Sequence, residues 1–294
     1  MITKGLEFVP QNAIPVRNFA AFEKKFSWNQ FVRFFKFVRK LSPDLSITFH
    51  APWWVNFALF LARVPKRVGV LSQWHSFLFL NAGVRQKRSR AEKHEAHYNL
   101  DLVAHALNEE LKFTEFKPLR LKSPFMERDL AQWNLTSKNY FVVHPGMGGS
   151  ALNWPLSSYE ALIRKLAQQK TVVVTGTAID AHFVNPLKEK LDGQKNILFL
   201  DQKINIHQLL LILKNAHAVL APSTGVVHLA ASLDTPTVGI YSPILVERAL
   251  RWGPLGQDVQ TLTPPLKTDK TDGVISADVM TQISVEDVYQ KLVR

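Results

Sequence analysis

The sequence contains no cysteine among its 294 residues. Without thiols, the chain can form no disulfide, no thiolate-ligated metal site and no cysteine nucleophile. The sequence also contains no apolar run of the roughly 18 residues that a membrane-spanning helix needs. Its first ten residues lack the continuous apolar segment of a secretory signal. These absences predict a cytoplasmic protein without a membrane span.

Acidic residues are scarce relative to basic residues, with 24 Asp and Glu against 36 Lys and Arg and a net charge of +12. The imbalance lies in one half of the chain. Residues 1–130 hold 21 basic and 11 acidic side chains, whereas residues 131–294 hold 15 and 13. A basic surface attracts nucleic acid, an anionic membrane or an acidic substrate. We therefore predict a basic domain over 1–130 and a nearly neutral domain over 131–294, with a Pro-containing linker at about 112–137.

The second half alternates short apolar runs with helical patterns. Strands bounded by Gly or Pro and separated by helices predict a parallel, doubly wound α/β sheet. The last helix, 284–294, begins at a Ser cap and either stays in this domain or packs back on the N-terminal domain. The strands are expected at 140–144, 171–175, 196–200, 218–221 and 237–240, and the helices at 156–169, 180–191, 207–215, 226–233 and 284–294.

The first half is rich in aromatic residues and has a weaker pattern. Residues 45–50 and 66–70 are expected to be strands, and 53–62 and 98–110 helices. The segment Phe26–Lys40 predicts a helix that either packs in the core or lies on a membrane surface. The pair Trp53 and Trp54 belongs either to the core or to a carbohydrate platform.

The first of two strand-to-helix junctions in the second half is glycine-rich. It reads HPGMGGS over residues 144–150, and Asn153-Trp154-Pro155 follow. Gly146, Gly148 and Gly149 would allow backbone N–H groups to approach an anion closely. The alternative is a tight loop after a strand.

The second junction reads PSTGVVHLAA over residues 222–231. Ser223 and Thr224 place hydroxyl groups at a predicted helix N-terminus, where unpaired N–H groups and the helix dipole favour a phosphate. His228 lies one turn further along the helix. The alternative is an N-cap hydroxyl with a structural histidine.

Both junctions follow strands of one parallel sheet, where open α/β sheets bind their ligands. In these segments the chain resembles glycosyltransferase family 9, the ADP-heptose:lipopolysaccharide heptosyltransferase group. HPGMGGSALNWPLSSYEALI is similar to the family's HPG…WP segment, and STGVVHLAASLDTPTVGIYSPI to its [DS]-[ST]-G-x-x-H-x-A-A segment. A weaker likeness joins Arg67–Gly69 and Arg85–Leu100 to the family's R-x-G strand and basic loop.

The resemblance implies a GT-B architecture, with two Rossmann-like domains facing a cleft and an inverting reaction. The donor would be a nucleotide-sugar, with ADP-heptose favoured, and no metal or other cofactor is expected. The acceptor would be an anionic glycolipid of the lipopolysaccharide core, reached at the cytoplasmic face of the inner membrane. The resemblance implies these donor-binding residues: Gly146, Met147, Gly148, Gly149, Ser150, Asn153, Thr175, Gly176, Ser223, Thr224, Gly225 and His228.

The sequence departs from the family pattern at three places. Residues 1–25 contain no R-x-G-x-x-G-D segment, whose Asp resembles the catalytic base, so we expect an N-terminal domain without that strand-loop unit and assign no catalytic residue. Leu152 stands where the family usually has Lys or Arg. Ser223 stands where many members have Asp.

Basic residues between 85 and 94 are the candidates for the acceptor side. Arg85, Arg88, Arg90 and His94, together with Lys87, could contact acceptor phosphates, and the alternative is a solvated loop. His75, His94 and Glu95 could supply a base, with a surface or structural role as the alternative for each.

The sequence thus favours an inverting glycosyltransferase. Three alternatives stay open: a catalytically impaired GT-B protein that binds nucleotide as a scaffold, a nucleotide-sugar epimerase, and a basic nucleic-acid binder. The last lacks a recognisable nucleic-acid-binding motif, so no nucleic acid is expected as partner. The sequence leaves the donor sugar, the acceptor, the base and the oligomeric state open.

Overall fold

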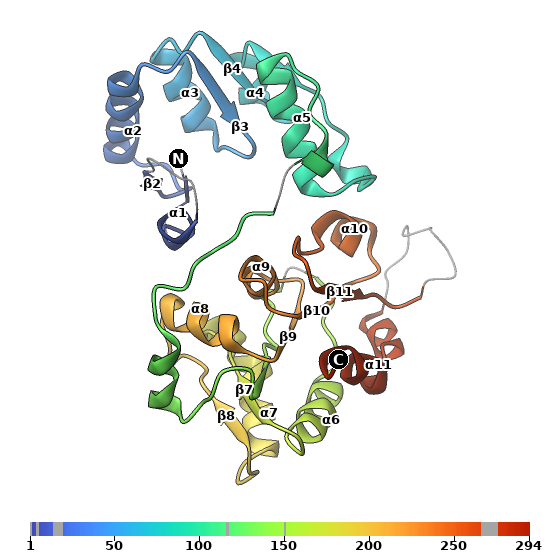
Figure 1. Cartoon of the computed structure of the whole chain (residues 1–294). Helices are drawn as coiled ribbons and strands as arrows, with labels where there is room; N and C mark the ends of the chain where they lie inside the picture. Colours follow the sequence, from blue (N-terminus) through green and yellow to red (C-terminus); the bar gives the residue numbers. More distant parts are fainter. Residues whose placement is uncertain (1, 4–5, 14–19, 116–117, 150, 266–275) are drawn as a thin grey trace. The chain divides into compact units, whose positions relative to one another are not determined.

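A computed structural model of the chain describes residues 2–3, 6–13, 20–115, 118–149, 151–265 and 276–294. The chain divides into two compact units (Figure 1). The N-terminal unit comprises Met1–Gln11 and Pro15–Lys117, and the C-terminal unit Asn12–Ile14 and Pro118–Arg294. The main division therefore falls after residue 117, inside the expected linker and before residue 130.

The N-terminal unit contains a three-stranded parallel sheet with the order β3-β4-β5 and a separate parallel pair, β1-β2. Its strands and helices are β1 (Ile2–Thr3), α1 (Phe8–Asn12), β2 (Ala21–Phe22), α2 (Trp28–Leu41), β3 (Leu45–Thr48), α3 (Trp53–Leu61), β4 (Lys66–Val70), α4 (Trp74–Phe79), β5 (Ala82–Val84) and α5 (Glu95–Leu107).

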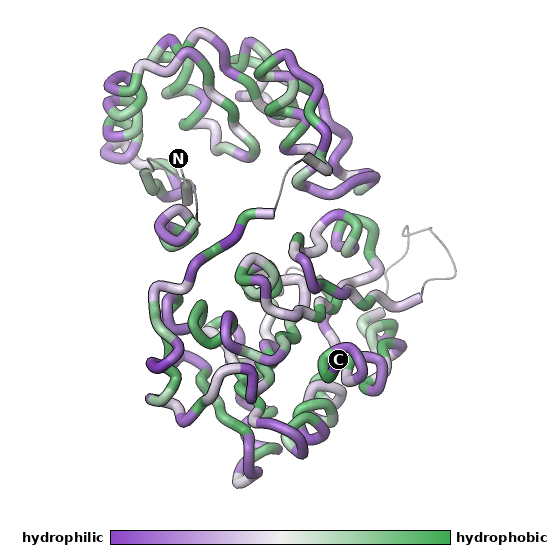
Figure 2. The backbone as a smooth tube through the Cα atoms, viewed as in Figure 1, coloured by the Kyte–Doolittle hydropathy of each residue, from purple (hydrophilic) through white to green (hydrophobic). Residues whose placement is uncertain are grey.

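Helix α2 is amphipathic and packs in the core of this unit. Ser27 caps it by accepting a hydrogen bond from the Gln30 N–H. Phe31, Phe34 and Val38 recur at helical spacing and are buried against a cluster that contains Trp54 of α3. Figure 2 shows hydrophobic and hydrophilic residues interleaved along α2. Of the two interpretations of this segment, packing in the core is therefore confirmed for its apolar face.

The C-terminal unit contains a six-stranded parallel sheet with the order β11-β10-β9-β6-β7-β8. Its strands and helices are β6 (Tyr140–Val143), α6 (Leu156–Leu166), β7 (Thr171–Val174), α7 (Ala181–Lys190), β8 (Ile197–Phe199), α8 (Ile206–Asn215), β9 (Ala218–Pro222), α9 (Gly225–Ser232), β10 (Thr237–Ile240), α10 (Ala249–Trp252), β11 (Val259–Leu262) and α11 (Val285–Leu292).

Helices cover both faces of this sheet, as the alternating pattern predicts. Side chains of one face, such as Phe141 and Leu220, share a core cluster with α6, α7 and α11. On the other face, the Tyr140 hydroxyl donates to the Ile212 carbonyl of α8 at 2.7 Å. The expected doubly wound α/β unit is thus present.

The final helix α11 packs within the C-terminal unit, against α6 (Figure 1). Val288 and Leu292 of α11 are buried in the cluster that also holds α6. The Trp154 indole N–H, just before α6, donates to the Ile283 carbonyl at 2.9 Å. Of the two positions expected for this helix, the described contacts support the one in its own unit.

Candidate functional site

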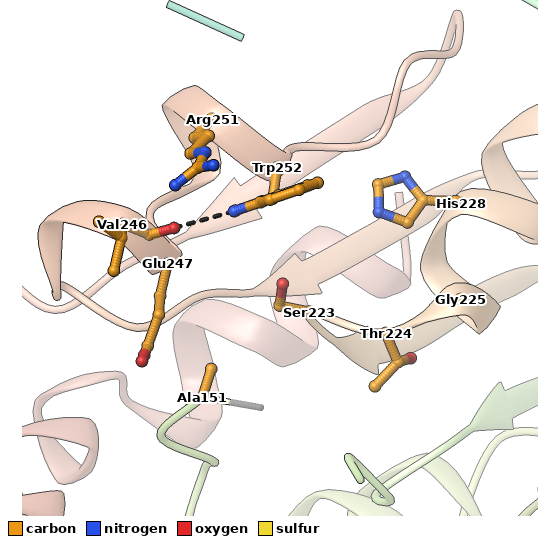
Figure 3. A pocket seen from close by; sticks show the side chains of 9 residues that line it. All are labelled: Ala151, Ser223, Thr224, Gly225, His228, Val246, Glu247, Arg251 and Trp252. Carbon is orange, nitrogen blue, oxygen red and sulfur yellow. Dashed lines mark hydrogen bonds between the residues drawn. The ribbon is translucent and has the colours of Figure 1, made fainter. Parts of the chain in front are cut away.

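A pocket of about 520 Å³ lies beyond the carboxyl ends of strands in the larger sheet (Figure 3). Ser223 follows β9 directly, and the other lining residues follow β6 and β10 or begin α9. The pocket is lined by Ala151, Ser223, Thr224, Gly225, His228, Val246, Glu247, Arg251 and Trp252.

The strand order places this pocket where ligands bind in open parallel sheets. From β6 the chain continues to β7 and β8 on one side, and then returns to β9, β10 and β11 on the other. The connections therefore diverge between neighbouring strands β6 and β9. Such a topological switch point leaves a crevice at the carboxyl edge of the sheet.

The N-terminus of α9 forms one wall of the pocket. Thr224 is its N-cap residue with extended backbone angles, but its hydroxyl does not cap the helix. The Thr224 Oγ1 atom is buried and has no hydrogen-bond partner among the described residues. A Cβ atom added to Gly225 would meet nothing within 4 Å, so this backbone is accessible to a ligand. Free N–H groups, the helix dipole and an unpaired hydroxyl together suit an anion.

His228 lies on the exposed side of α9 and lines the same pocket. In Figure 3 its ring and the Trp252 ring extend toward each other. The prediction that Ser223, Thr224, Gly225 and His228 lie together is therefore met by the geometry, although their role stays a prediction.

The opposite wall consists of the segment after β10, which the sequence interpretation missed. It contributes Val246, Glu247, Arg251 and Trp252 to the pocket. The Trp252 indole N–H donates to the Val246 carbonyl at 2.8 Å, and the Arg251 guanidinium lies 4.9 Å from the Trp252 ring centre. The available signal was the position of this charged and aromatic segment after a predicted strand of the same sheet.

Tyr241 connects the two walls of the pocket through hydrogen bonds. Its side chain is fully buried, and its hydroxyl donates to the Trp252 carbonyl at 2.9 Å. Ser223 also hydrogen-bonds to this phenol. Burial raises the pKa of the Tyr241 hydroxyl, so the group stays protonated and can donate at all physiological pH values.

In the glycine-rich loop after β6, several of the described residues pack against or hydrogen-bond to the protein itself. A Cβ atom on Gly146 would lie 2.1 Å from Asp180 Cγ, so Gly146 permits close packing with that side chain. Met147 is buried. The Asn153 amide donates to the Pro145 carbonyl at 2.7 Å and accepts from the Trp154 N–H and the Tyr159 hydroxyl.

Of the predicted loop residues, Gly148 and Gly149 have open space where a Cβ would be, and Gly149 has a φ of +76°. Ser150 lies outside the described residues. Among the described residues that follow β6, Ala151 lines the pocket. The loop therefore offers accessible backbone at two glycines, next to residues that hold its shape.

Thr175 and Gly176, after β7, do not line the pocket. Thr175 is buried, and its hydroxyl oxygen lies 3.0 Å from His144 Nδ1. A Cβ atom on Gly176 would lie 2.8 Å from a methyl group of Val184. Burial lowers the pKa of His144, whereas the Asp180 carboxylate 3.9 Å away acts in the opposite direction.

The predicted acceptor-side residues lie in the N-terminal unit, and each contacts another residue of that unit. Arg88 forms an ion pair with Glu95, and both side chains are largely buried, whereas Arg85 and Arg90 are exposed. Arg90 lies 3.6 Å from Glu92, and Arg85 lies over the Phe77 ring. The His94 side chain accepts from the Ala96 N–H and so caps α5.

His75, the other candidate base, is buried between Asn56 and Gln73, at 3.1 and 2.7 Å. Burial lowers its pKa. Leu152, where the family usually carries a cation, packs against the core of the C-terminal unit. Within the described ranges, no group of three or more His, Asp or Glu side chains could hold a metal ion. None of the described helices has the length and hydropathy that a membrane span requires.

The sequence model of glycosyltransferase family 9 (heptosyltransferase) matches residues 31–272 of this chain. A Haemophilus influenzae protein named "Putative glycosyltransferase" is 31% identical over 199 residues. This match covers 64% of the chain, and the chain spans only 57% of the length of that protein.

Two solved structures share the fold over nearly the whole chain. The Escherichia coli ADP-heptose lipopolysaccharide heptosyltransferase II has a TM-score of 0.80 at 18% identity, with 99% of this chain and 86% of that chain covered. The family 9 glycosyltransferase from Veillonella parvula has a TM-score of 0.79 at 16% identity, with 99% and 87% covered. The expected GT-B fold class is therefore confirmed.

Proposed function

The chain belongs to glycosyltransferase family 9, and from this premise we propose that it is an inverting glycosyltransferase. Its donor is a nucleotide-sugar, with ADP-heptose the first choice because a heptosyltransferase that uses it has the same fold. Its acceptor is an anionic glycolipid of the lipopolysaccharide core or a related glycan. The pocket at α9 is the donor site.

The observation that carries this proposal is the unpaired hydroxyl of Thr224. A buried polar atom without a partner costs about 1–3 kcal/mol, and a bound ligand would remove this cost. The hydroxyl stands at the first turn of α9, beside the accessible backbone of Gly225. A diphosphate supplies the acceptor oxygens and the negative charge that this position favours.

The same groups would stabilise the departing nucleoside diphosphate. Negative charge grows on the diphosphate as the glycosidic bond breaks, and fixed donors near that charge lower the barrier. The α9 N-terminus and His228 are such groups in this pocket. The proposal therefore requires no metal ion.

Basic charge and exposed aromatic side chains of the N-terminal unit support a role for it in binding the acceptor and a membrane surface. Residues 20–90 contain 13 Lys and Arg but only two acidic residues. Trp28, Trp53, Phe60 and Trp74 are 70%, 38%, 43% and 62% exposed. Aromatic side chains with neighbouring cations suit the interface of an anionic membrane, and we place the protein at the cytoplasmic face of the inner membrane.

Calorimetric titration with ADP, UDP and ADP-heptose tests the donor site. We expect ADP and ADP-heptose to bind, UDP to bind more weakly, and Thr224→Val to lower the affinity for ADP about tenfold because a charge-assisted hydrogen bond is lost. Thr261→Val is the matched control, because Thr261 is an exposed residue of β11 outside the pocket.

Equal affinities of wild type and Thr224→Val for ADP would exclude the proposed phosphate contact. A transfer assay with lipopolysaccharide-core acceptors then separates the activities. Nucleotide binding without transfer would favour the scaffold alternative, and conversion of the donor sugar without an acceptor would favour an epimerase.

A further inference from the structure

A second unpaired polar atom lies in the same pocket, on the wall opposite Thr224. The Glu247 Oε2 atom is buried and has no hydrogen-bond partner within the described ranges. An unpaired carboxylate oxygen away from water is more costly than an unpaired hydroxyl. Such an atom is available to accept a hydrogen bond from a group outside the protein.

The segment that carries Glu247 is held in one conformation. The Glu247 N–H donates to the Ile244 carbonyl at 2.9 Å, and Arg248 Nε donates to the Pro243 carbonyl at 2.8 Å. The Trp252 side chain is tied to Val246, and its own carbonyl is tied to Tyr241. The backbone that carries the carboxylate is therefore ordered before any ligand arrives, which lowers the entropic cost of binding.

The neighbouring groups define what this carboxylate can bind. Trp252 is 37% exposed, and its ring lines the pocket together with Glu247. An ionised carboxylate only accepts hydrogen bonds, so it repels phosphate and pairs with O–H or N–H donors. An indole ring offers a flat apolar face on which the C–H face of a sugar ring can pack.

We propose that Glu247 and Trp252 form a sugar-binding subsite, in which the Glu247 carboxylate accepts hydrogen bonds from sugar hydroxyls and the ring packs on Trp252. The inference rests on the proposed function, because the sugar belongs to the nucleotide-sugar whose diphosphate lies at α9. Two rings of that ligand carry hydroxyls, the transferred sugar and the ribose. Both present the same chemistry to the carboxylate.

Calorimetric titration of the full chain with ADP, 2′-deoxy-ADP and ADP-heptose tests the subsite and separates the two rings. The variants are Glu247→Gln, Trp252→Leu and, as a control, Glu189→Gln, an exposed carboxylate on α7. We expect Glu247→Gln to weaken ADP-heptose binding about tenfold, as for loss of one charge-assisted hydrogen bond. Glu189→Gln should bind like wild type.

If Glu247→Gln lowers the affinity for ADP-heptose but not the affinity for ADP, the carboxylate binds the transferred sugar. If Glu247→Gln lowers the affinities for ADP and ADP-heptose equally, and wild type binds 2′-deoxy-ADP weakly, the carboxylate binds the ribose. Unchanged affinity of Glu247→Gln for every ligand that wild type binds would overturn the subsite and leave the donor site at α9 intact. Failure of wild type itself to bind any of the three ligands would overturn both proposals.

Protein stability provides a readout without ligand. Because Glu247→Gln removes a carboxylate whose buried Oε2 atom has no hydrogen-bond partner among the described residues, we expect its thermal midpoint in the absence of nucleotide to be equal to or above that of wild type. A lower midpoint would show that the carboxylate stabilises the fold itself and would contradict a ligand-binding role.

Discussion

Asn153 and Thr224 are both polar residues that were predicted to bind the nucleotide-sugar, yet their side chains have different partners in the structure. The Asn153 amide has protein partners on both its donor and acceptor sides, and it holds the loop after β6. The Thr224 hydroxyl has none among the described residues. Availability for a ligand thus depends on the partners that the fold supplies, which residue type alone does not reveal.

His144 shows the same principle for a titratable group. It is buried beside Thr175, and burial lowers its pKa from the ordinary value of 6.5. The folded protein therefore keeps this ring neutral at pH values where the unfolded chain takes up a proton. Stability from this residue is present above about pH 6.5 and is lost as the pH falls below it.

We expect the free energy of unfolding to fall as the pH is lowered from 7 to 5, with His144 contributing at most about 1.4 kcal/mol per pH unit. Urea denaturation of wild type and His144→Gln at several pH values measures this slope. His75 and His217 also have lowered pKa values and will keep part of the slope in the variant. An unchanged slope in His144→Gln would show that His144 does not contribute.

At the scale of elements, the helix α11 combines an N-terminal cap with an apolar face that packs against α6. Ser284 accepts a hydrogen bond from the Asp287 N–H at 3.0 Å, and the helix then buries Val288 and Leu292 against α6. The apolar positions and the cap were both recognisable from spacing. The partner helix was not, because packing across many residues leaves no local pattern.

Loss of this cap should destabilise the protein by about 1 kcal/mol in Ser284→Ala. Chemical denaturation followed by tryptophan fluorescence measures the change. Ser157→Ala on α6 is the matched control, because Ser157 is exposed and lies within a helix rather than at its cap. Equal midpoints in the two variants would mean that the cap does not stabilise α11.

The sequence was informative wherever a strand is continuously apolar. Strands such as β6, β7 and β10 lie within a residue of their predicted bounds because their burial on both faces leaves uniform apolar runs. Strand β11, with the sequence VQTL, was missed because it is a partly exposed edge strand. The pocket wall after β10 was missed because it has no repeating pattern.

At the scale of the whole molecule, charge and exposed aromatic surface are concentrated in one unit. Helix α4 exposes Trp74, Phe77 and Leu78 by 62%, 51% and 64%. Arg85 lies 5.6 Å from the Phe77 ring centre, so a cation adjoins this apolar surface. The C-terminal unit, by contrast, lies in the part of the chain that is nearly neutral. We therefore propose that the N-terminal unit is the part of the chain that an anionic membrane would attract.

We expect the protein to sediment with vesicles of phosphatidylcholine and phosphatidylglycerol, and less with phosphatidylcholine alone. The double substitution Trp74→Ser and Phe77→Ser should weaken this binding at least about tenfold, because each buried aromatic side chain contributes about 1.5–3 kcal/mol. Added salt should weaken it further.

Ile179→Ser is the control for this experiment, because Ile179 is 71% exposed in the C-terminal unit. Vesicle binding that is equally reduced by Ile179→Ser would indicate a general effect of surface hydrophobicity. Binding that is independent of phosphatidylglycerol would contradict the role of the basic surface.

The wall of the pocket after β10 is one uninterrupted piece of chain between two strands of the sheet. The segment starts after Ile240 and returns to the sheet at Val259. Within it the chain passes close to itself at Gly253, where an added Cβ atom would lie 2.7 Å from the Ala249 carbonyl oxygen. The helix α9, by contrast, lies on a separate segment. Under the proposed function, the corresponding segment of a family member with another donor could replace this one, provided that it keeps a tyrosine at position 241 to hydrogen-bond to Ser223. The helix α9 and the strands of the sheet would keep their own sequence. Recombination of this kind is a route by which donor preference could evolve independently of the fold.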